Sequence, residues 1–326
     1  MNRRAFITGL GALLALPLGA EAQSSKVSRI GFLSGQTPAG EAVILEALRQ
    51  GLHEHGYVEG QNVVIEVRYA EAKVDRLPQL ARELVGLKVN LLVVAGNLSA
   101  LAARAATTEI PVVFWAVGDP VGQGFAASLG RPGGNMTGFM DYRAELTAKR
   151  LALLKEALPK VRRIAVLFNE ASPANNASAF KEAETAARAL SLGLRFLSVR
   201  DPSEFEGAVD MAKRDNADAV YLVPDPLFRS HRVRLAEAAL RSRLPWVGWA
   251  KEFAGDGALL AYGIDFRDVA RRTAGYAARI LNGEKPGNLP IQQPANIELV
   301  VNLKTAKTLG LTIPPSLLLR ADQVIE

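Results

Sequence analysis

The sequence predicts an α/β protein of two lobes, each a doubly wound parallel sheet, joined by a hinge of several strands. Short apolar runs alternate with longer amphipathic stretches, which is typical of parallel strands connected by crossover helices. The same order of elements recurs in both halves of the chain. The length of 326 residues also exceeds what one hydrophobic core usually holds, so two domains of about 150 residues are expected.

The predicted strands are runs of Val, Ile and Leu that do not alternate with polar residues, as expected of strands covered by helices on both faces. They are 30–34, 63–69, 91–95, 112–117 and 164–168, and a further short strand is predicted at 136–140. Between them, apolar residues recur three and four positions apart, the spacing of an amphipathic helix. The predicted helices are 41–55, 77–87, 100–107, 146–158, 178–190, 227–243 and 266–281.

Three segments of the first half have counterparts in the second half at a nearly constant offset. The paired segments begin at Arg29 and Arg163, at Asn90 and Asp218, and at Pro111 and Pro245. Two copies of one doubly wound unit therefore explain the chain better than one large sheet.

Turn signals predict where the chain crosses between the lobes. The Pro- and Gly-rich cluster 131–135 precedes a short strand, so the first crossing is expected near 141–145. A second is expected after Tyr262 and Gly263, and a third in the Pro-rich stretch 285–294. Lobe 1 is then residues 27–142 and 264–290, and lobe 2 is residues 143–263 and 291–326. Such a hinge resists twisting but bends.

Residues 1–22 have the layout of a secretory signal peptide, with Arg3 and Arg4 before an apolar run and small residues near Ala22. The run is shorter than the roughly 20 residues of a membrane-spanning helix. It also resembles a twin-arginine signal, although Asn2 stands where Ser or Thr is usual, so both export routes stay open. We expect an exported, soluble, monomeric periplasmic protein without membrane insertion.

Composition excludes several classes of protein. The chain has no cysteine, which excludes disulfides, zinc-thiolate sites and a lipid-anchored Cys. The net charge is +6, and the positive residues are scattered without interleaved aromatics, so no nucleic-acid partner is expected.

Polar residues follow the predicted strands, where ligands of open α/β sheets bind. Ser34 and Gly35 stand at the end of the first strand. Gly96, Asn97 and Ser99 lie before the helix predicted from residue 100, whose exposed N–H groups and dipole favour a carboxylate or phosphate. Simple N-capping by Asn97 or Ser99 is the alternative.

Two carboxylates, Asp119 and Asp225, stand at turns between a strand and a helix, where each can hold an ammonium group or simply cap the helix. The prolines on both sides of Asp225 fix its backbone and favour it. Asn169, directly after the run 164–168, is a further candidate.

Three aromatic residues are candidates for shaping the ligand site. Trp115 and Trp249 end strands, and Tyr262 lies at the predicted hinge. Stacking on a ligand and ordinary core packing both remain open for each.

Enzyme signatures are largely missing from the sequence. His53 and His55 diverge on a helix, and His231 lies among arginines. No metal-ligand spacing, Gly-Lys phosphate loop or Gly-x-Ser-x-Gly elbow occurs. A relaxed dinucleotide fingerprint at 122–127 does not directly follow a strand. No catalytic residue, metal or cofactor is therefore expected.

Several motifs in fixed order carry a family resemblance. They are Gly-Tyr-Val-Glu-Gly-Gln-Asn-Val at 56–63, Val-Gly-Asp-Pro-Val at 117–121, Arg-Pro-Gly-Gly-Asn at 131–135, Pro-Asp-Pro at 224–226 and Asn-Leu-Lys-Thr-Ala-Lys at 302–307. From about Arg29 to Glu326 the chain resembles the ABC transporter substrate-binding proteins of the tryptophan/tyrosine-type family, a branch of the type 1 periplasmic binding fold. The resemblance implies a ligand between the lobes, a permease and an ATPase as partners, and no catalysis. Residues 96–99 read Gly-Asn-Leu-Ser where that family commonly has Gly-Thr-Pro-Ala, so the solute stays unnamed.

The resulting hypothesis is a solute-binding protein of an ABC importer that captures a small polar solute, an amino acid or an aromatic-amino-acid-like molecule, by lobe closure. The ligand carboxylate is expected near Ser34, Asn97 and Ser99, and its ammonium near Asp225 or Asp119. Its side chain is expected against the three aromatic residues. A periplasmic ligand sensor for a signalling partner and a periplasmic α/β enzyme are the alternatives.

Overall fold

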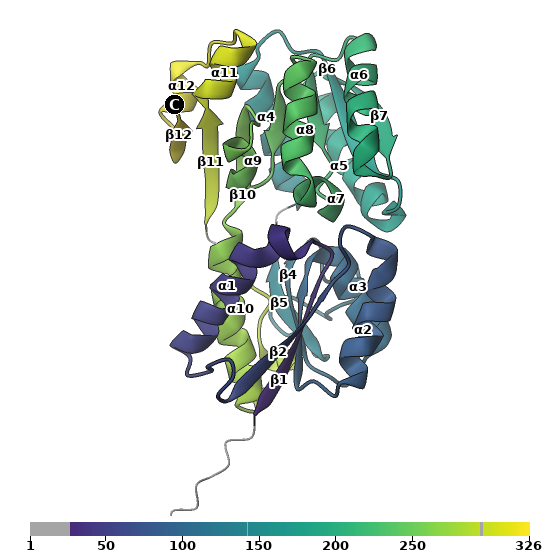
Figure 1. Ribbon diagram of the computed structural model, residues 1–326, viewed down its shortest axis with the longest axis vertical. Helices are drawn as coiled ribbons and strands as arrows, with labels where there is room; N and C mark the ends of the chain where they lie inside the picture. Colours follow the sequence, from purple (N-terminus) through teal and green to yellow (C-terminus); the bar gives the residue numbers. More distant parts are fainter. Residues whose placement is uncertain (1–26, 142, 294–295) are drawn as a thin grey trace, which may run out of the picture.

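The computed structural model describes residues 27–141, 143–293 and 296–326, so the signal peptide predicted at 1–22 lies outside the described residues. The described chain forms two lobes, drawn one above the other in Figure 1, each with a sheet between layers of helices.

Lobe 1 is built on a sheet of order β2-β1-β3-β4-β5, in which all neighbours are parallel. Its strands are β1 Ser28–Ser34, β2 Val63–Tyr69, β3 Leu91–Ala95, β4 Val112–Val117 and β5 Met136–Met140. Its helices are α1 Pro38–Glu54, α2 Leu77–Gly86, α3 Gly96–Ala106 and α10 Phe266–Leu281, with short 3₁₀ turns at Val74–Arg76 and Pro286–Asn288. Helices α1 and α10 lie together on one side of this sheet, and α2 and α3 lie on the other (Figure 1).

Lobe 2 is built on a larger sheet of order β12-β11-β10-β9-β8-β6-β7, parallel except where β11 runs against β10. Its strands are β6 Arg163–Asn169, β7 Gly193–Val199, β8 Ala219–Leu222, β9 Trp246–Gly248, β10 Leu260–Ile264, β11 Ile297–Asn302 and β12 Gln323–Ile325. Its helices are α4 Arg143–Ala157, α5 Pro173–Ala189, α6 Phe205–Arg214, α7 Pro226–Ser230, α8 Arg232–Arg241, α9 Lys251–Gly255, α11 Leu303–Leu309 and α12 Pro315–Leu318, with a 3₁₀ turn at Pro202–Glu204.

Each sheet is buried on both faces, which explains the unbroken apolar runs. In β1, Ile30 and Phe32 pack into the core under α1 and α10, whereas Leu33 packs into the core under α2 and α3. Gly51 of α1 lies so close to α10 that an added Cβ would be 2.7 Å from the Cβ of Ala274. The two helices therefore pack at close range.

The two lobes repeat one plan, since β7-β6-β8-β9-β10 has the order of β2-β1-β3-β4-β5. Matching side chains tie the strand starts together. The Oδ1 atom of Asn90 accepts from the N–H of Arg29 at 2.8 Å, and the Oδ2 atom of Asp218 accepts from the N–H of Arg163 at 2.9 Å. The prediction of two doubly wound parallel-sheet lobes is confirmed.

In each lobe, the last strand of the repeated unit contains a glycine that packs directly against the backbone of the preceding strand or of the residue that follows it. A Cβ on Gly138 of β5 would lie 1.9 Å from the carbonyl oxygen of Phe114, and one on Gly263 of β10 would lie 1.8 Å from that of Trp249. Both strands lead into connections between the lobes, from β5 to α4 and from β10 to α10. No other residue fits at these two positions without moving backbone.

The predicted helices differ from the observed ones at two places that matter for the site. The helix predicted from residue 100 begins at Gly96, so Asn97 and Ser99 lie in its first turn and do not cap it. The helix predicted at 227–243 is split into α7 and α8, because the backbone of His231 is not helical. The edge strand β7, whose residues alternate between exposed and buried, was not predicted from an apolar run.

Candidate functional site

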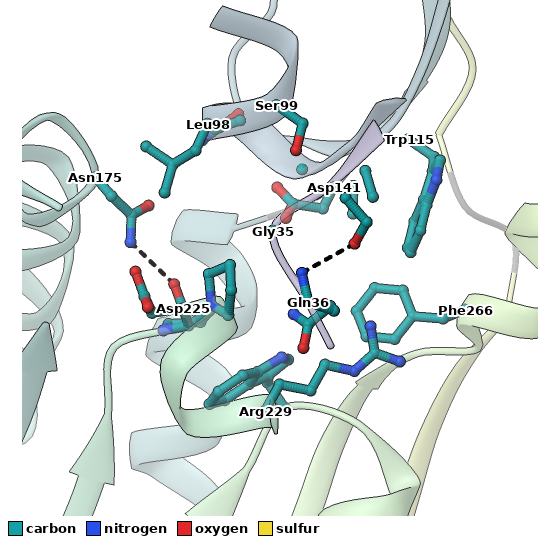
Figure 2. A pocket seen from close by; sticks show the side chains of 18 of the residues that line it. Gly35, Gln36, Leu98, Ser99, Trp115, Asp141, Asn175, Asp225, Arg229 and Phe266 are labelled. Carbon is teal, nitrogen blue, oxygen red and sulfur yellow. Dashed lines mark hydrogen bonds between the residues drawn. The ribbon is translucent and has the colours of Figure 1, made fainter. Parts of the chain in front are cut away.

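A cavity of about 120 Å³ lies between the lobes. The carboxyl ends of β1, β3 and β4 reach it from lobe 1, and the loops after β8 and β9 reach it from lobe 2. Asp141 and Phe266, which stand on connections between the lobes, also line it (Figure 2). This is the position at which open α/β sheets bind ligands.

The cavity collects most of the candidate residues. Those from lobe 1 are Ser34, Gly35, Gly96, Asn97, Ser99 and Trp115. Those from lobe 2 are Asp225 and Trp249.

The start of α3 presents backbone N–H groups and a hydroxyl to the cavity. Gly96 opens the helix with a φ of +78°, a conformation that favours glycine. The Asn97 side chain turns aside, since its Oδ1 accepts from the N–H of Gly118 at 3.0 Å. The Ser99 side chain is buried, its Oγ has no hydrogen-bond partner among the described residues, and it points into the cavity in Figure 2.

Asp225 is held in a dense hydrogen-bond network. Its carboxylate accepts from the amide of Asn169 at 2.9 Å, from the hydroxyl of Ser172 at 2.7 Å and from the N–H of Leu227 at 2.9 Å, where it caps α7. Asn169 thus reaches the site through Asp225, without lining the cavity.

Two other candidates lie away from this cavity. Asp119 caps no helix; it closes a turn by accepting from the N–H of Gly122 at 2.8 Å, and its φ is +40°. Tyr262 is in β10, where its carbonyl oxygen accepts from Nε of Arg150 at 2.7 Å. Neither residue is among the described residues that line this cavity, although Asp119 lines a second hollow between the lobes, opposite Asn175 and Glu182.

Aromatic rings form one wall of the cavity. Trp115 meets Phe266 edge to face with ring centroids 5.6 Å apart, and the Arg229 guanidinium lies 4.6 Å from the centroid of Phe266. The residue after Trp115, Ala116, has a φ of +54°, which is unusual for a residue with a side chain. The register between β4 and β5 shifts at this point, so local strain accompanies the placement of Trp115.

Several cavity residues were not predicted, among them Gln36, Glu41, Arg150, Asn175 and Arg229. Most stand on helices, and rules about strand ends do not address them. A signal existed for Glu41: it falls on the same apolar stripe as the buried Ile44, Leu45 and Leu48 of α1. A charged residue on such a stripe indicates either a buried partner or a binding role.

Glu41 has an unusual electrostatic environment. It is fully buried, and this burial raises its pKa to about 7, while the positive charge of Arg229 and the nearby Ser34 hydroxyl act to lower it and Glu252 acts to raise it. Its two carboxylate oxygens have no partner of hydrogen-bond geometry among the described residues.

The lobes touch directly beside the cavity. The Ser230 hydroxyl of α7 donates to Oε1 of Gln36 at 3.0 Å, and the N–H of Thr37 lies 3.3 Å from the same hydroxyl. A Cβ on Gly35 would lie 2.7 Å from Cγ of Pro226. A small residue at 35 is what lets the two loops meet.

Within the described residues, no three His, Asp or Glu side chains are grouped so as to hold a metal ion. None of the described helices is both long and apolar enough to cross a membrane.

Comparison with known proteins agrees with this architecture. Residues 33–325 match the family described as ABC transporter substrate binding protein. The chain is 28% identical over 262 residues to a tyrosine-binding protein of Clostridioides difficile, covering 80% of this chain and 75% of that protein.

Two solved structures are similar along nearly their whole length. A conserved domain protein of Vibrio cholerae has a TM-score of 0.85 and 30% identity, over 92% of this chain and 100% of that one. A domain from Streptococcus pneumonia in complex with L-Trp has a TM-score of 0.83 and 27% identity, over 91% of this chain and 99% of that one.

Proposed function

We propose, from the premise that this chain belongs to the ABC transporter substrate binding protein family, that it captures an amino-acid-like solute between its lobes for an importer. The family implies a small-molecule ligand, with a permease and an ATPase as partners. The tyrosine-binding relative and the L-Trp complex support an amino acid as the ligand class. The observation that carries the proposal is the unpartnered, buried Ser99 hydroxyl at the start of α3.

The start of α3 suits a carboxylate. The first-turn N–H groups of a helix have no partner within the helix, and the helix dipole favours negative charge there. A ligand carboxylate would accept from these groups and from the Ser99 hydroxyl, which otherwise stays buried without a hydrogen bond at a cost of about 1–3 kcal/mol.

The aromatic wall suits an apolar or aromatic ligand side chain. Trp115 and Phe266 already pack edge to face, and Trp249 lines the cavity from lobe 2. A ring inserted among them would bury apolar surface and gain the geometry that aromatic pairs prefer.

Lobe closure would enclose the solute. The contacts of Ser230 with Gln36 and Thr37 join the lobes next to the cavity, and they can form only when the cleft is narrow. Connections between the lobes at the ends of β5 and β10 leave bending as the natural motion.

The site of action would be the periplasm. The signal-peptide layout of residues 1–22 supports export, with Arg3 and Arg4 suited to the twin-arginine route. Cell fractionation tests this: the wild-type chain should reach the periplasm, and replacing both arginines by Lys should block only the twin-arginine route. Retention of the wild-type chain in the cytoplasm would contradict the proposal.

The ligand class is tested by thermal unfolding of the mature chain with the twenty L-amino acids, glucose, ribose and inorganic phosphate. A cognate ligand at 100 times its dissociation constant should stabilise the folded state by about 2.7 kcal/mol. Quenching of Trp fluorescence by the same compound would support a position near Trp115 and Trp249, the two tryptophans that line the cavity. Stabilisation by a sugar and by no amino acid would contradict the proposal.

A further inference from the structure

We propose that Glu41 is the residue that binds the ammonium group of the solute, and that the site therefore selects compounds with a primary amine next to their carboxylate. The inference rests on the proposed function and deepens it. It differs from the expectation from sequence, in which Asp225 or Asp119 holds this group.

Glu41 lies where a ligand in the cavity can contact it, and its burial prevents water from solvating its charge. It stands in the first turn of α1, lines the cavity and is fully buried. Its two oxygens have no hydrogen-bond partner among the described residues. A buried carboxylate in this state is costly unless a cation or donors reach it.

The groups around Glu41 do not provide that cation. From β1 it faces Ser34, from β2 Tyr69, from α7 Arg229 and from α9 Glu252. The negative charge of Glu41 acts with burial to raise the pKa of Tyr69, which places that hydroxyl nearby.

Arg229 is the nearest cation, and its guanidinium is already engaged. Its Nε and Nη2 lie 3.0 and 2.9 Å from Oε1 of Glu252, and its face covers the ring of Phe266. No ion pair joins Arg229 to Glu41 within the described residues, so Arg229 affects Glu41 only through space. The other charged residues lining the cavity are Asp141, Arg150 and Asp225.

The two aspartates expected from sequence suit the ammonium less well. Asp225 accepts bonds from Asn169, Ser172 and Leu227, so its carboxylate already stabilises the turn that leads into α7. Asp119 closes its own turn outside the cavity. Glu41 is instead a carboxylate that burial has removed from water, with only the Ser34 hydroxyl near enough to act on it and no partner of hydrogen-bond geometry among the described residues.

Glu41 and Ser99 together define a zwitterion site. Ser99 with the start of α3 offers donors, Glu41 offers acceptors, and both line one cavity, which also holds the aromatic wall. An α-amino acid carries an ammonium and a carboxylate on one carbon, and its side chain projects away from both. The cavity therefore has one place for each part of such a molecule.

The test compares each amino acid with the same molecule lacking its amine. The thermal unfolding panel of twenty L-amino acids first identifies the amino acid that binds most tightly. Calorimetry then gives the dissociation constants of L-tryptophan and L-tyrosine, and of that amino acid if it is another one. The amine-free analogues of the first two are 3-(indol-3-yl)propanoate and 3-(4-hydroxyphenyl)propanoate. The proteins are the wild type, Glu41→Gln, and Glu46→Gln as the matched control, because Glu46 is an exposed residue of the same helix.

The wild type and Glu46→Gln should bind the amino acid at least about tenfold more tightly than its amine-free analogue. Glu41→Gln should lose at least about tenfold in affinity for the amino acid, keep its affinity for the analogue, and so lose most of the discrimination. Unchanged discrimination in Glu41→Gln would overturn the assignment, as would an equal loss for both compounds, which would indicate general damage to the cavity. A wild type that binds no amino acid would overturn the proposed function itself, so the two failures are distinguishable.

Discussion

The Ser230 hydroxyl of lobe 2 donates a hydrogen bond to Oε1 of Gln36 in lobe 1, at 3.0 Å. Gln36 lines the cavity from the loop between β1 and α1, and Ser230 stands on α7. This contact forms only while the lobes are together, so it should favour the closed form over the open one.

Ser230→Ala should accelerate ligand release. The change removes the hydrogen bond to Gln36 and the longer one from the N–H of Thr37. At about 0.5–1.5 kcal/mol for the first alone, the dissociation rate should rise by at least roughly two- to tenfold, with little effect on association. Stopped-flow Trp fluorescence measures both rates. Ser242→Ala is the control, because Ser242 bonds to Asp210 within lobe 2 at 2.9 Å, and it should leave the rates unchanged.

Ser99→Ala should weaken binding without weakening the fold. The Ser99 hydroxyl is buried without a partner among the described residues, so its removal should keep or raise the unfolding midpoint of the ligand-free protein. Affinity for the amino acid should fall by at least about tenfold, since a hydrogen bond to a charged group is worth about 1.5–3 kcal/mol. Calorimetry with the amino acid and with its carboxamide measures this. An equal loss for both compounds would contradict a carboxylate at α3.

Asp225→Ala should mainly destabilise lobe 2. It removes three accepted hydrogen bonds and the N-cap of α7, at an expected cost of about 2–4 kcal/mol in the free energy of unfolding. Urea unfolding measures this cost. Asp210→Ala, which removes an exposed bond on α6, should cost less than about 1 kcal/mol. The Asp225→Ala protein could instead be fully stable and bind an amino acid and its amine-free analogue equally well. That result would favour Asp225 over Glu41 as the residue that binds the ammonium group.

Binding should depend on pH through Glu41. Burial raises its pKa to about 7, so the carboxyl is increasingly neutral as pH falls below that value. A neutral carboxyl cannot pair with an ammonium ion, and affinity for the amino acid should therefore drop by about tenfold per pH unit below about 7 and level off above it. Calorimetry from pH 5.5 to 8.5 tests this, and Glu41→Gln should lack the dependence. A dependence that survives in Glu41→Gln would assign it to another group.

Replacing two different glycines by Ala should change the free energy of unfolding in opposite directions. Gly138→Ala places a Cβ 1.9 Å from the carbonyl oxygen of Phe114, which should destabilise lobe 1 by about 2–4 kcal/mol. Gly207→Ala, in the exposed first turn of α6 with open space around it, should stabilise the protein by about 0.4–1 kcal/mol. Thermal and urea unfolding give both values. Equal effects would mean that the backbone at 138 relaxes without cost.

The fold was predictable because its strongest signals are local. Strands buried on both faces, such as β1 with Ile30 and Leu33 in opposite cores, read as apolar runs. The edge strand β7 lacks this signal, since its residues are partly exposed. The predicted helix is split at His231, whose backbone is not helical, and no Gly or Pro marks this break in the sequence. The predicted family resemblance is confirmed by the match over residues 33–325.

The site was less predictable because it depends on contacts between lobes. The rule of strand ends led to Ser34, Ser99, Trp115 and Trp249, which line the cavity. Asp119 follows β4 as Asp225 follows β8, yet its carboxylate closes a local turn with Gly122 and lies outside the cavity. The position of Glu41 on the apolar stripe of α1 was visible in the sequence, but its closeness to Arg229 and Glu252 of lobe 2 was not.

Helix α10 completes lobe 1, but it follows strands β6 to β10 of lobe 2 in the sequence and is therefore synthesised after them. On the ribosome, the side of the first sheet that α10 covers, together with the inner side of α1 around Gly51 and Leu48, stays without its cover until residue 281 emerges. The nascent chain therefore has a long interval during which a chaperone can hold it. A translocase that transports unfolded polypeptide can act during that interval. A translocase that accepts only folded proteins can act only after almost the whole chain has been translated.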